Sequence, residues 1–402
     1  MNILVLTSVY KVESLGNEDK STNVVNSFAR EWVKQGHKVI VIHNAHRYPR
    51  FIHRLPRKLR EKLAVKLGFF IGGIIPEAHY DDLGVDVWRL PVLKYIPHRG
   101  ISRRSAAKQA EKIEKILKEA DFVPEVITGH WASPQMEIIS ELKKTFSCRT
   151  AVVLHGTDYV DQPHFMNKDY LKYIDKLGCR SKTQAEIIQK LLSMHELPFV
   201  CYSGVPDEYL EKFKLNIDKF DNIAKWKFTY VGRLVGYKRV DIIIQALNKI
   251  DFEWELNIVG DGAERKKLEN LCSDLQCTDK VKFHGKIARD QVMDLLKETH
   301  CFVMVSKGEV FGLVYLEAMA ASCITIGSIG EGIDGIIIDG QNGYLCEAAN
   351  LDSLVMKLKE MLCNPDLQKV ATEGYKTAGE FSDSSVAMDY LRKITGYYYL
   401  GN

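Results

Sequence analysis

Short hydrophobic runs recur along the chain, separated by longer stretches in which apolar residues return with helical spacing. In the first part of the chain these runs occupy residues 3–7, 38–43, 85–90, 126–129 and 151–154. A second series begins near Trp226 and occupies residues 227–231, 255–259, 281–284, 301–305 and 324–326. Buried strands that alternate with helices are typical of doubly wound parallel sheets. The two series therefore predict two α/β domains, with ligands at the carboxyl ends of their strands.

The first helix is expected shortly after the first run. We expect Ser21 to be its N-cap, because a hydroxyl can satisfy one of the free N–H groups of a first turn. Gly36 is expected to end it, because glycine readily adopts the left-handed conformation found after a helix. An apolar stripe at helical spacing supports this prediction and consists of Val24, Val25, Phe28, Trp32 and Val33.

Length and composition are those of a two-domain soluble protein. The 402 residues suit two domains of about 200 residues, with a boundary expected within residues 204–225. Nine cysteines, an odd number without a Cys-x-x-Cys pair, indicate reduced thiols in a cytoplasmic protein rather than metal ligands. The first residues do not resemble a signal peptide, and the apolar stretch 67–75 is too short to span a bilayer.

Two glutamates eight residues apart mark the segment 306–321. Glu309 lies in a glycine-flanked loop after a buried run, and Glu317 lies within an otherwise apolar helix. We expect the helix to start at Gly312 or Leu313, where free N–H groups form a site for a phosphate. Glu317 can reach back toward the same ligand and bind a sugar diol or a cation. The alternative is that Glu317 meets a lysine or arginine of the core.

A second candidate element is the segment 230–241. A β-rich run ends at Gly232, and two long cations, Arg233 and Lys238, follow five residues apart. Such a pair can clamp a diphosphate between a guanidinium and an ammonium group. The alternative is a pair of surface cations on an ordinary strand-to-helix loop.

Together the two segments resemble the motifs of retaining family-4 glycosyltransferases. The likeness extends to Phe-Gly-Leu after the first glutamate and Glu-Ala-Met-Ala at the second. The resemblance implies an α/β protein of GT-B fold, with two Rossmann-like doubly wound domains facing across a cleft. Residues 1–205 would form the acceptor-side domain and residues 206–382 the domain that binds the nucleotide sugar. A last helix at residues 383–399 would pack back on the first domain.

The resemblance also implies roles for individual residues. Arg233 and Lys238 would neutralise the departing diphosphate, Glu309 would position the hydroxyls of the donor sugar, and Glu317 would hold the ribose diol. His155, in a His-Gly-Thr-Asp segment, would lie beneath the donor sugar near the reacting carbon. His130 is a candidate on the acceptor side. The further donor-binding candidates are Gly16, Asp158, Gly232, Lys286, Phe311, Gly312 and Leu313.

The function implied is transfer of a sugar from a nucleotide diphospho-sugar to a hydroxyl acceptor with retention of configuration. We expect a UDP-linked donor and a glycan or lipid-linked acceptor in cell-surface polysaccharide synthesis, with no cofactor and no metal. Two alternatives remain: an epimerase or hydrolase acting on the sugar nucleotide, and a non-catalytic binding module. A dinucleotide dehydrogenase is excluded, because the first run is not followed by the Gly-x-Gly-x-x-Gly fingerprint.

Charge is concentrated in one segment, although the net charge is only +3. Residues 47–66 contain eight lysines and arginines and a single acid, Glu61. Leucines recur every fourth position at 59, 63 and 67, which predicts a basic amphipathic helix within residues 47–75. Such a helix suits the surface of an anionic membrane, and the alternative is a solvated helix with its leucines in the core. We do not expect nucleic acid, because no aromatic residue interleaves the cations between Arg54 and Lys66.

Vesicle sedimentation tests this membrane prediction. We expect the protein to bind vesicles that contain anionic lipid at low salt and to be released at high salt. The reason is that each cation near such a surface contributes about 1 kcal/mol before screening. Neutral vesicles are the control, and failure to bind anionic vesicles at low salt would exclude the membrane role.

Overall fold

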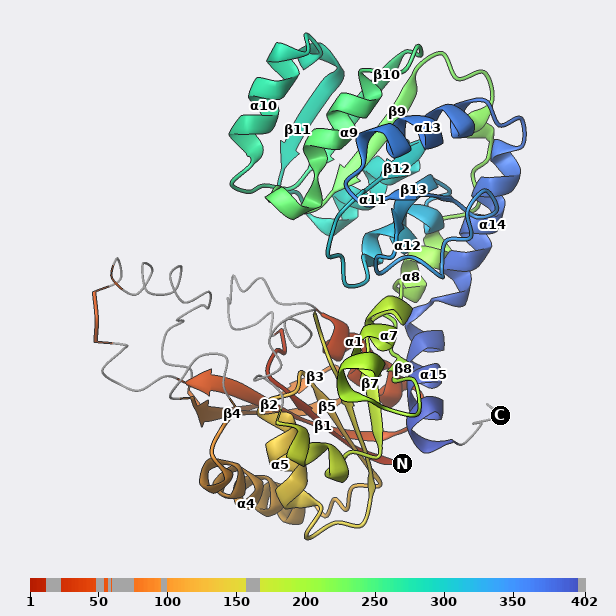
Figure 1. Cartoon of the computed structure of the whole chain (residues 1–402). Coiled ribbons are helices and arrows are strands. Elements are labelled where there is room, and N and C mark those ends of the chain that lie inside the picture. Colours follow the sequence, from red (N-terminus) through yellow and green to blue (C-terminus); the bar gives the residue numbers. More distant parts are fainter. Residues whose placement is uncertain are drawn as a thin grey trace. The chain divides into compact units, whose positions relative to one another are not determined.

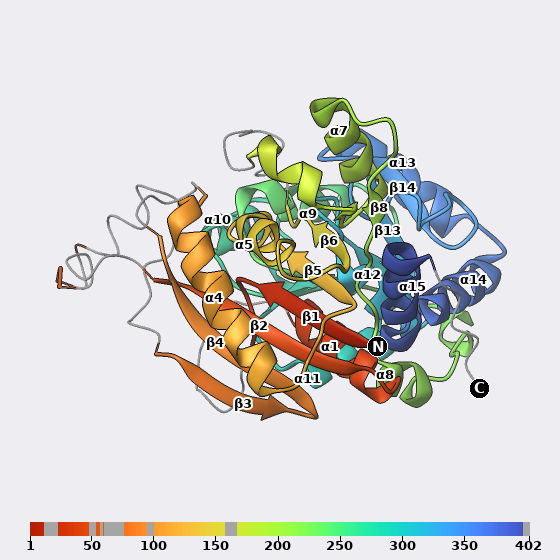
Figure 2. The same ribbon diagram turned by 90° about the horizontal axis from the view of Figure 1, so that it is seen from below.

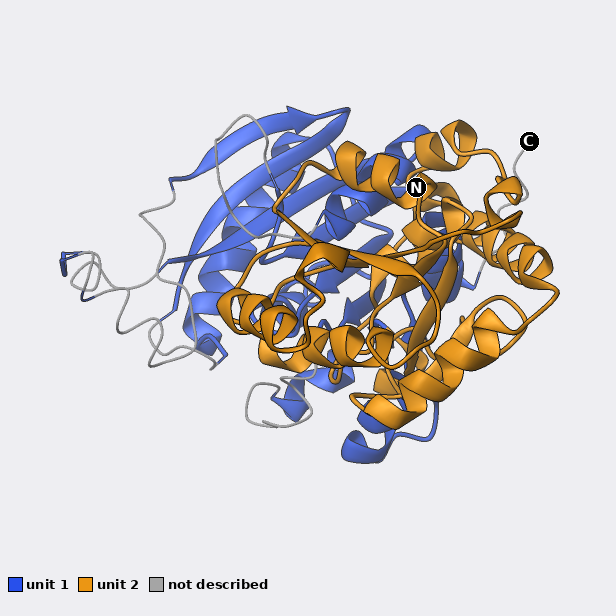
Figure 3. Ribbon diagram, turned by 90° about the horizontal axis from the view of Figure 1, so that it is seen from above, with its two compact units in different colours: residues 1–180, 185–201, 386–402 blue, residues 181–184, 202–385 orange. Residues whose placement is uncertain are grey.

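The computed structural model describes residues 1–11, 23–47, 54–56, 59, 76–94, 100–156 and 167–396 (Figure 1). The chain divides into two compact units (Figure 3). Unit 1 contains Met1–Arg180, Ala185–Cys201 and Val386–Asn402, and unit 2 contains Ser181–Gln184 and Tyr202–Ser385.

Unit 1 is built on an eight-stranded sheet with the order β3-β4-β2-β1-β5-β6-β7-β8. All neighbouring strands are parallel except β3 and β4, which are antiparallel. The five strands predicted from the apolar runs are confirmed. The bounds are β1 (Asn2–Thr7), β2 (Lys38–Arg47), β3 (Ala78–Asp82), β4 (Val85–Leu93), β5 (Val126–His130), β6 (Arg149–Val153), β7 (Lys176–Cys179) and β8 (Phe199–Val200).

Helices cover both faces of this sheet. In Figure 2, α4 (Arg103–Glu119) and α5 (Gln135–Leu142) lie on one face, and α1 (Val24–Lys34) lies on the other. The predicted stripe of α1 is confirmed at Phe28 and Trp32, which are buried. The N-cap is Asn23, without a side-chain hydrogen bond, and not Ser21, which lies outside the described residues. Gly36 follows the helix with a φ of +82°, as expected for its left-handed end.

The last helix, α15 (Asp383–Thr395), supplies two buried contacts within unit 1. The indole nitrogen of Trp32 in α1 donates to the carbonyl oxygen of Ala387 over 2.9 Å. The hydroxyl of Tyr390 lies 2.5 Å from the hydroxyl oxygen of Thr128 in β5. These polar contacts fix both the position and the rotation of the helix, which apolar packing alone leaves less specified. A further described α-helix, α7 (Lys182–Leu192), has its first three residues in unit 2 and the rest in unit 1.

Unit 2 is a six-stranded parallel sheet with the order β11-β10-β9-β12-β13-β14. The order of its strands reverses between β9 and β12, which is the switch point where doubly wound sheets bind ligands. The predicted run 301–305 forms a strand only over its first three residues. The bounds are β9 (Trp226–Val231), β10 (Trp254–Val259), β11 (Val281–Gly285), β12 (Cys301–Val303), β13 (Ile324–Ile329) and β14 (Tyr344–Glu347).

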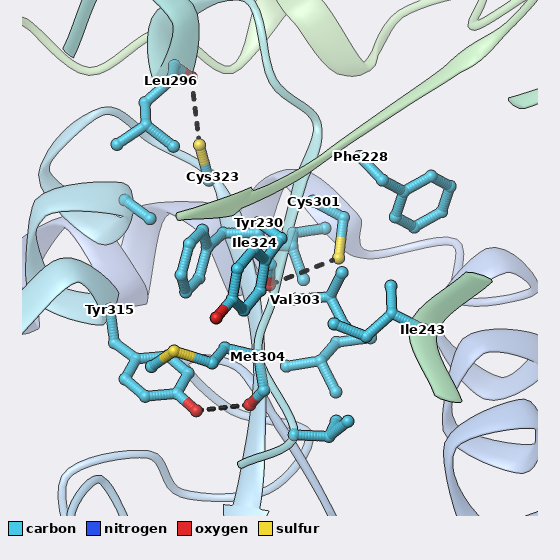
Figure 4. Close-up of a cluster of buried hydrophobic side chains, with 14 of the residues drawn as sticks. Phe228, Tyr230, Ile243, Leu296, Cys301, Val303, Met304, Tyr315, Cys323 and Ile324 are labelled. Carbon is cyan, nitrogen blue, oxygen red and sulfur yellow. Dashed lines mark hydrogen bonds between the residues drawn. The ribbon is translucent and has the colours of Figure 1, made fainter. Parts of the chain in front are cut away.

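The core of unit 2 lies between this sheet and its helices. Figure 4 shows Tyr230 of β9 near Val303 of β12, with Phe228 on the side of Cys301 and Tyr315 below. The Tyr315 hydroxyl donates to the carbonyl oxygen of Met304, so the one polar group of that ring is satisfied inside the core. The helices are α8 (Asp207–Lys212), α9 (Val240–Leu247), α10 (Arg265–Asp274), α11 (Arg289–Lys297), α12 (Leu313–Ala320), α13 (Leu351–Leu362) and α14 (Leu367–Glu380).

Among the helices of the described residues, none combines the length and the apolar character needed to cross a bilayer.

Candidate active site

An ion pair lies at the switch point of unit 2. Lys238, in the loop after β9, contacts the carboxylate of Glu309, in the loop after β12. The two side chains are only 11% and 15% exposed. The Lys238 ammonium also lies 3.8 Å from the sulfur of Met304. In a site so enclosed, each charge depends on the other, because a single unpaired charge at this depth would be costly. The structure therefore brings together two of the predicted residues.

The loop that carries Glu309 is held from both sides by the segment 330–333. The carboxylate of Glu331 accepts hydrogen bonds from the backbone N–H groups of Gly308 (2.8 Å) and Glu309 (2.6 Å). The N–H of Gly332 donates to the carbonyl oxygen of Glu309 over 2.9 Å. A Cβ at Gly332 would lie 2.4 Å from the backbone of Val310, so only glycine fits this close approach. Burial, and then the charge of Glu309, raises the pKa of Glu331.

The loop that carries Arg233 depends on two close backbone approaches. A Cβ at Gly260, which has a φ of +127°, would lie 1.9 Å from the carbonyl oxygen of Gly232. The N–H of Gly232 donates to the carbonyl oxygen of Val259 over 2.9 Å, so the turns after β9 and β10 are joined. Arg233 itself is exposed, and its guanidinium donates to the hydroxyl of Tyr237 over 2.6 Å. Of the two predicted cations, Lys238 is therefore buried and Arg233 is accessible.

Helix α12 begins directly after Gly312, which has a φ of +80°, in agreement with the predicted start. The first N–H to bond within the helix is that of Tyr315, to the carbonyl oxygen of Gly312 (3.0 Å). The N–H groups of Leu313 and Val314 precede it and are those that a helix start leaves without intrahelical partners. Phe311, just before the helix, is buried with its ring 5.6 Å from that of Tyr202.

Glu317 forms an ion pair with Arg289, the first residue of α11. The Glu317 side chain is 10% exposed and that of Arg289 is 40% exposed. Burial acts against the charge on Arg289, but the Glu317 carboxylate outweighs it and raises the pKa of the guanidinium. The Arg289 guanidinium also lies 5.2 Å from the ring centre of Tyr209. The structure thus contains the arginine partner considered as the alternative for Glu317, and a role with ribose remains a prediction.

Two histidines meet in unit 1, where β5 and β6 end. Nδ1 of His130 lies 2.9 Å from Nε2 of His155, and the indole ring of Trp131 stacks on His155 at 4.1 Å. Burial, and then the guanidinium of Arg180, lowers the pKa of His130 to about 3. The same causes, together with His130, hold the pKa of His155 well below its usual range. Both imidazoles are therefore neutral at physiological pH.

One described residue among the predicted donor-binding positions, Lys286, is not brought into these clusters. Lys286 is exposed after β11, which is separated from β9 by β10. Gly16 and Asp158 lie outside the described residues, as does most of the basic segment 47–75. Among the residues that the structure describes, no group of three or more His, Cys, Asp or Glu side chains could hold a metal ion.

Comparison with known proteins identifies the family. The family model described as glycosyl transferases group 1 matches residues 212–377. An uncharacterized glycosyltransferase of Methanocaldococcus jannaschii is 31% identical over 326 residues, which cover 78% of this chain and 87% of that protein. The chain belongs to the group 1 glycosyl transferases. It is therefore a glycosyltransferase. The family model matches within unit 2, and the match to the Methanocaldococcus protein is long enough to include part of unit 1 as well.

More distant similarities agree with this assignment. The N-acetyl-alpha-D-glucosaminyl L-malate synthase of Bacillus anthracis is 25% identical over 315 residues, covering 75% of this chain and 79% of that enzyme. Among solved structures, HepE of Anabaena in complex with UDP superimposes with a TM-score of 0.66 at 15% identity, covering 99% of this chain and all of that one. At this identity the structural likeness shows the fold, which is GT-B.

Sequence reasoning gave no role to several residues of this glycosyltransferase that act on predicted ones. Arg289, Glu331 and Tyr390 hydrogen-bond to predicted residues, and the charge of Arg180 acts on both histidines. Glu331 carried a usable signal, because it stands in a glycine-rich segment where the family has a second glycine. The other three lie far in sequence from their partners and in unremarkable surroundings, so no local pattern pointed to them.

Substituting the two glutamates separately tests their assignment. Glu317→Gln should weaken UDP binding about tenfold, because a charge-assisted hydrogen bond to the ribose is lost. Glu309→Gln should not weaken UDP binding but should impair sugar transfer, because Glu309 is assigned to the donor sugar. Isothermal titration calorimetry with UDP measures the first effect and a transfer assay the second.

The control for this pair is Glu380→Gln, at an exposed glutamate in the last turn of α14. It should change neither quantity. An equal loss of UDP affinity in the Glu309 and Glu317 variants would show that the division of roles is wrong.

Proposed function

We propose that this glycosyltransferase moves a hexose from a UDP-linked donor to a hydroxyl of a glycan or lipid-linked glycan, with retention of anomeric configuration. The observation that carries the proposal is the enclosed Lys238–Glu309 pair at the switch point of unit 2. It places a cation and a carboxylate where a doubly wound sheet binds its ligand. The cation can bind a diphosphate, and the carboxylate can accept hydrogen bonds from sugar hydroxyls.

UDP is favoured as the nucleotide by the structural neighbours. HepE of Anabaena is described in complexes with UDP, with UDP and glucose, and with UDP-glucose. Retention of configuration is supported by the resemblance of the Glu309–Glu317 spacing to the signature of retaining enzymes. Both points remain proposals for this chain.

The proposed chemistry rests on stabilising the leaving UDP. As the bond between the anomeric carbon and the diphosphate breaks, negative charge builds on the phosphate oxygens. Lys238, Arg233 and the free N–H groups at the start of α12 would stabilise that charge. Because Lys238 is paired before the donor arrives, the diphosphate must replace Glu309 as its partner. Glu309 is then available to accept hydrogen bonds from the hydroxyls of the sugar.

The acceptor and the location of the enzyme are proposed from the charge of one segment and from the division of the chain into two units. We propose that residues 1–205 serve the acceptor and residues 206–382 the donor, in the cytoplasm at the inner face of the membrane. The cations of residues 47–66 support a membrane-proximal acceptor through their charge. His130 was the candidate for acceptor contact, but its side chain is fully buried, which favours a different role for it.

A donor screen that measures nucleotide release tests the proposal. UDP should be released from one UDP-sugar at a rate that rises strongly when a glycan or lipid-linked acceptor is added. Arg233→Ala and Lys238→Ala should each lower turnover about 100-fold, because each removes a preorganised charge partner of the leaving group. The control is Lys249→Ala, at an exposed lysine of the same unit.

Thermal melting accompanies this assay, because removing Lys238 leaves Glu309 in an enclosed site without its partner. Activities are compared at temperatures where all variants are folded. Near wild-type turnover in either variant would refute the clamp at that residue. Equal nucleotide release with and without acceptors would identify a hydrolase or an epimerase instead.

A further inference from the structure

A chain of polar side chains runs through the interior of unit 1 and ends at His155. The hydroxyls of Thr128 and Tyr390 lie 2.5 Å apart, and the Tyr390 hydroxyl lies 3.4 Å from Nε2 of His130. Nδ1 of His130 in turn lies 2.9 Å from Nε2 of His155. Thr128 and His130 belong to β5, whereas Tyr390 comes from α15, more than 250 residues later, at a sequence separation of 260 from His130.

These hydrogen bonds lie in a buried part of unit 1, which makes the loss of any one of them costly. Thr128 and His130 have no exposed surface, and Tyr390 is 1% exposed. In such surroundings water cannot replace a missing partner, so the members of the chain depend on one another. Arg180 is buried as well, and its positive charge disfavours a proton charge on either ring. The two imidazoles are therefore both neutral and share a single hydrogen bond.

Neutral imidazoles that share a hydrogen bond must hold matched tautomers. If Tyr390 donates to Thr128, its oxygen accepts from Nε2–H of His130, and Nδ1 of His130 accepts from Nε2–H of His155. If every donor is reversed, His155 carries its proton on Nδ1 instead. Whichever way the hydrogen bonds run, the direction in which the Tyr390 hydroxyl donates selects one tautomer of His155. The other nitrogen of His155 is then a defined donor or acceptor.

Trp131 restrains the same ring from its face. Its φ of +68° is unfavourable for a bulky residue, so the surrounding structure must hold it in place. It persists because the backbone around it is held: Trp131 N–H donates to the carbonyl oxygen of Val153 (3.0 Å), and the Gln135 side chain donates to that of His130 (2.8 Å). The result is the stacked contact with His155, with ring planes 21° apart.

We propose that His130 and Tyr390 are positioning residues that fix the tautomer and orientation of His155, with Trp131 restraining its ring. This inference rests on the proposed function only where it gives His155 a place beside the donor sugar. It explains why the fully buried His130 lies within hydrogen-bonding distance of His155. It also gives the last helix of the chain a part in catalysis, through the hydroxyl of Tyr390.

Tyr390→Phe tests the proposal with little change in packing. The ring contacts with Phe28 (5.1 Å) and Trp32 (5.4 Å) are kept, while the link to His130 is lost. We expect kcat to fall about fivefold, the size of effect of one neutral hydrogen bond, with KM for the donor unchanged. The matched control is Tyr344→Phe in unit 2, a buried tyrosine whose hydroxyl accepts from Asn364 over 2.7 Å. It should lower thermal stability to a similar extent without the change in kcat.

A second readout does not depend on turnover. Nitrogen NMR of the full-length protein with labelled imidazoles should show one tautomer for His130 and His155 in the wild type and a mixture in Tyr390→Phe. Unchanged tautomers together with unchanged kcat in Tyr390→Phe would overturn the proposal. If the wild type releases no UDP from any donor while the tautomer change is still seen, the proposed function fails and the positioning of His155 stands.

Discussion

The ion pair between Lys238 and Glu309 is the constraint around which the candidate site of unit 2 is arranged. The two residues are 71 positions apart in sequence and meet because β9 and β12 are neighbours in the sheet. Neither charge is stable alone at this depth, and even the pair gains little over an apolar contact, because both ions lose their hydration. Stability therefore gives a weak explanation for the Lys238–Glu309 pair. The proposed function gives a better one, in which Lys238 is a cation placed to bind an incoming diphosphate.

The surrounding loops serve the same purpose. The carboxylate of Glu331 and the N–H of Gly332 hold the backbone of Glu309 on both sides. Gly260 allows the turn after β10 to approach the turn that carries Arg233. Unit 1 uses a different principle, since its histidines are neutral and are oriented by hydrogen bonds and stacking. Unit 2 thus contributes a charged pair, and unit 1 contributes a pair of neutral, hydrogen-bonded rings.

The sequence predicted the strands well where they are long apolar runs, because such runs have few alternatives to burial in a parallel sheet. It did not reveal β3, which is mostly polar, β7 and β14, which have four residues each, or β8, which has two. It placed the cap of α1 at Ser21 because residue type alone does not fix where a helix begins, and the structure begins it after Asn23. The run 301–305 was predicted as one strand because all five residues are apolar. Met304 and Val305 are as buried as the strand before them, but they lie beyond its end.

The candidate site was predicted residue by residue, but its pairings were not. Glu309 and Lys238 each stood out through their motifs, whereas their contact depends on strand order, which local patterns do not encode. Arg289 and Tyr390 reach Glu317 and His130 from elements distant in sequence. These long-range contacts are a property of the folded sheet. The resemblance to known enzymes did not predict these contacts either.

The claim at the centre of this account is that the donor diphosphate replaces Glu309 as the partner of Lys238. A crystal structure of the protein with bound UDP tests it most directly. We predict that the Lys238 ammonium and the Arg233 guanidinium contact the phosphate oxygens, with Glu309 no longer paired to Lys238. UDP bound with its phosphates away from Lys238, and the Lys238–Glu309 pair still intact, would contradict the account.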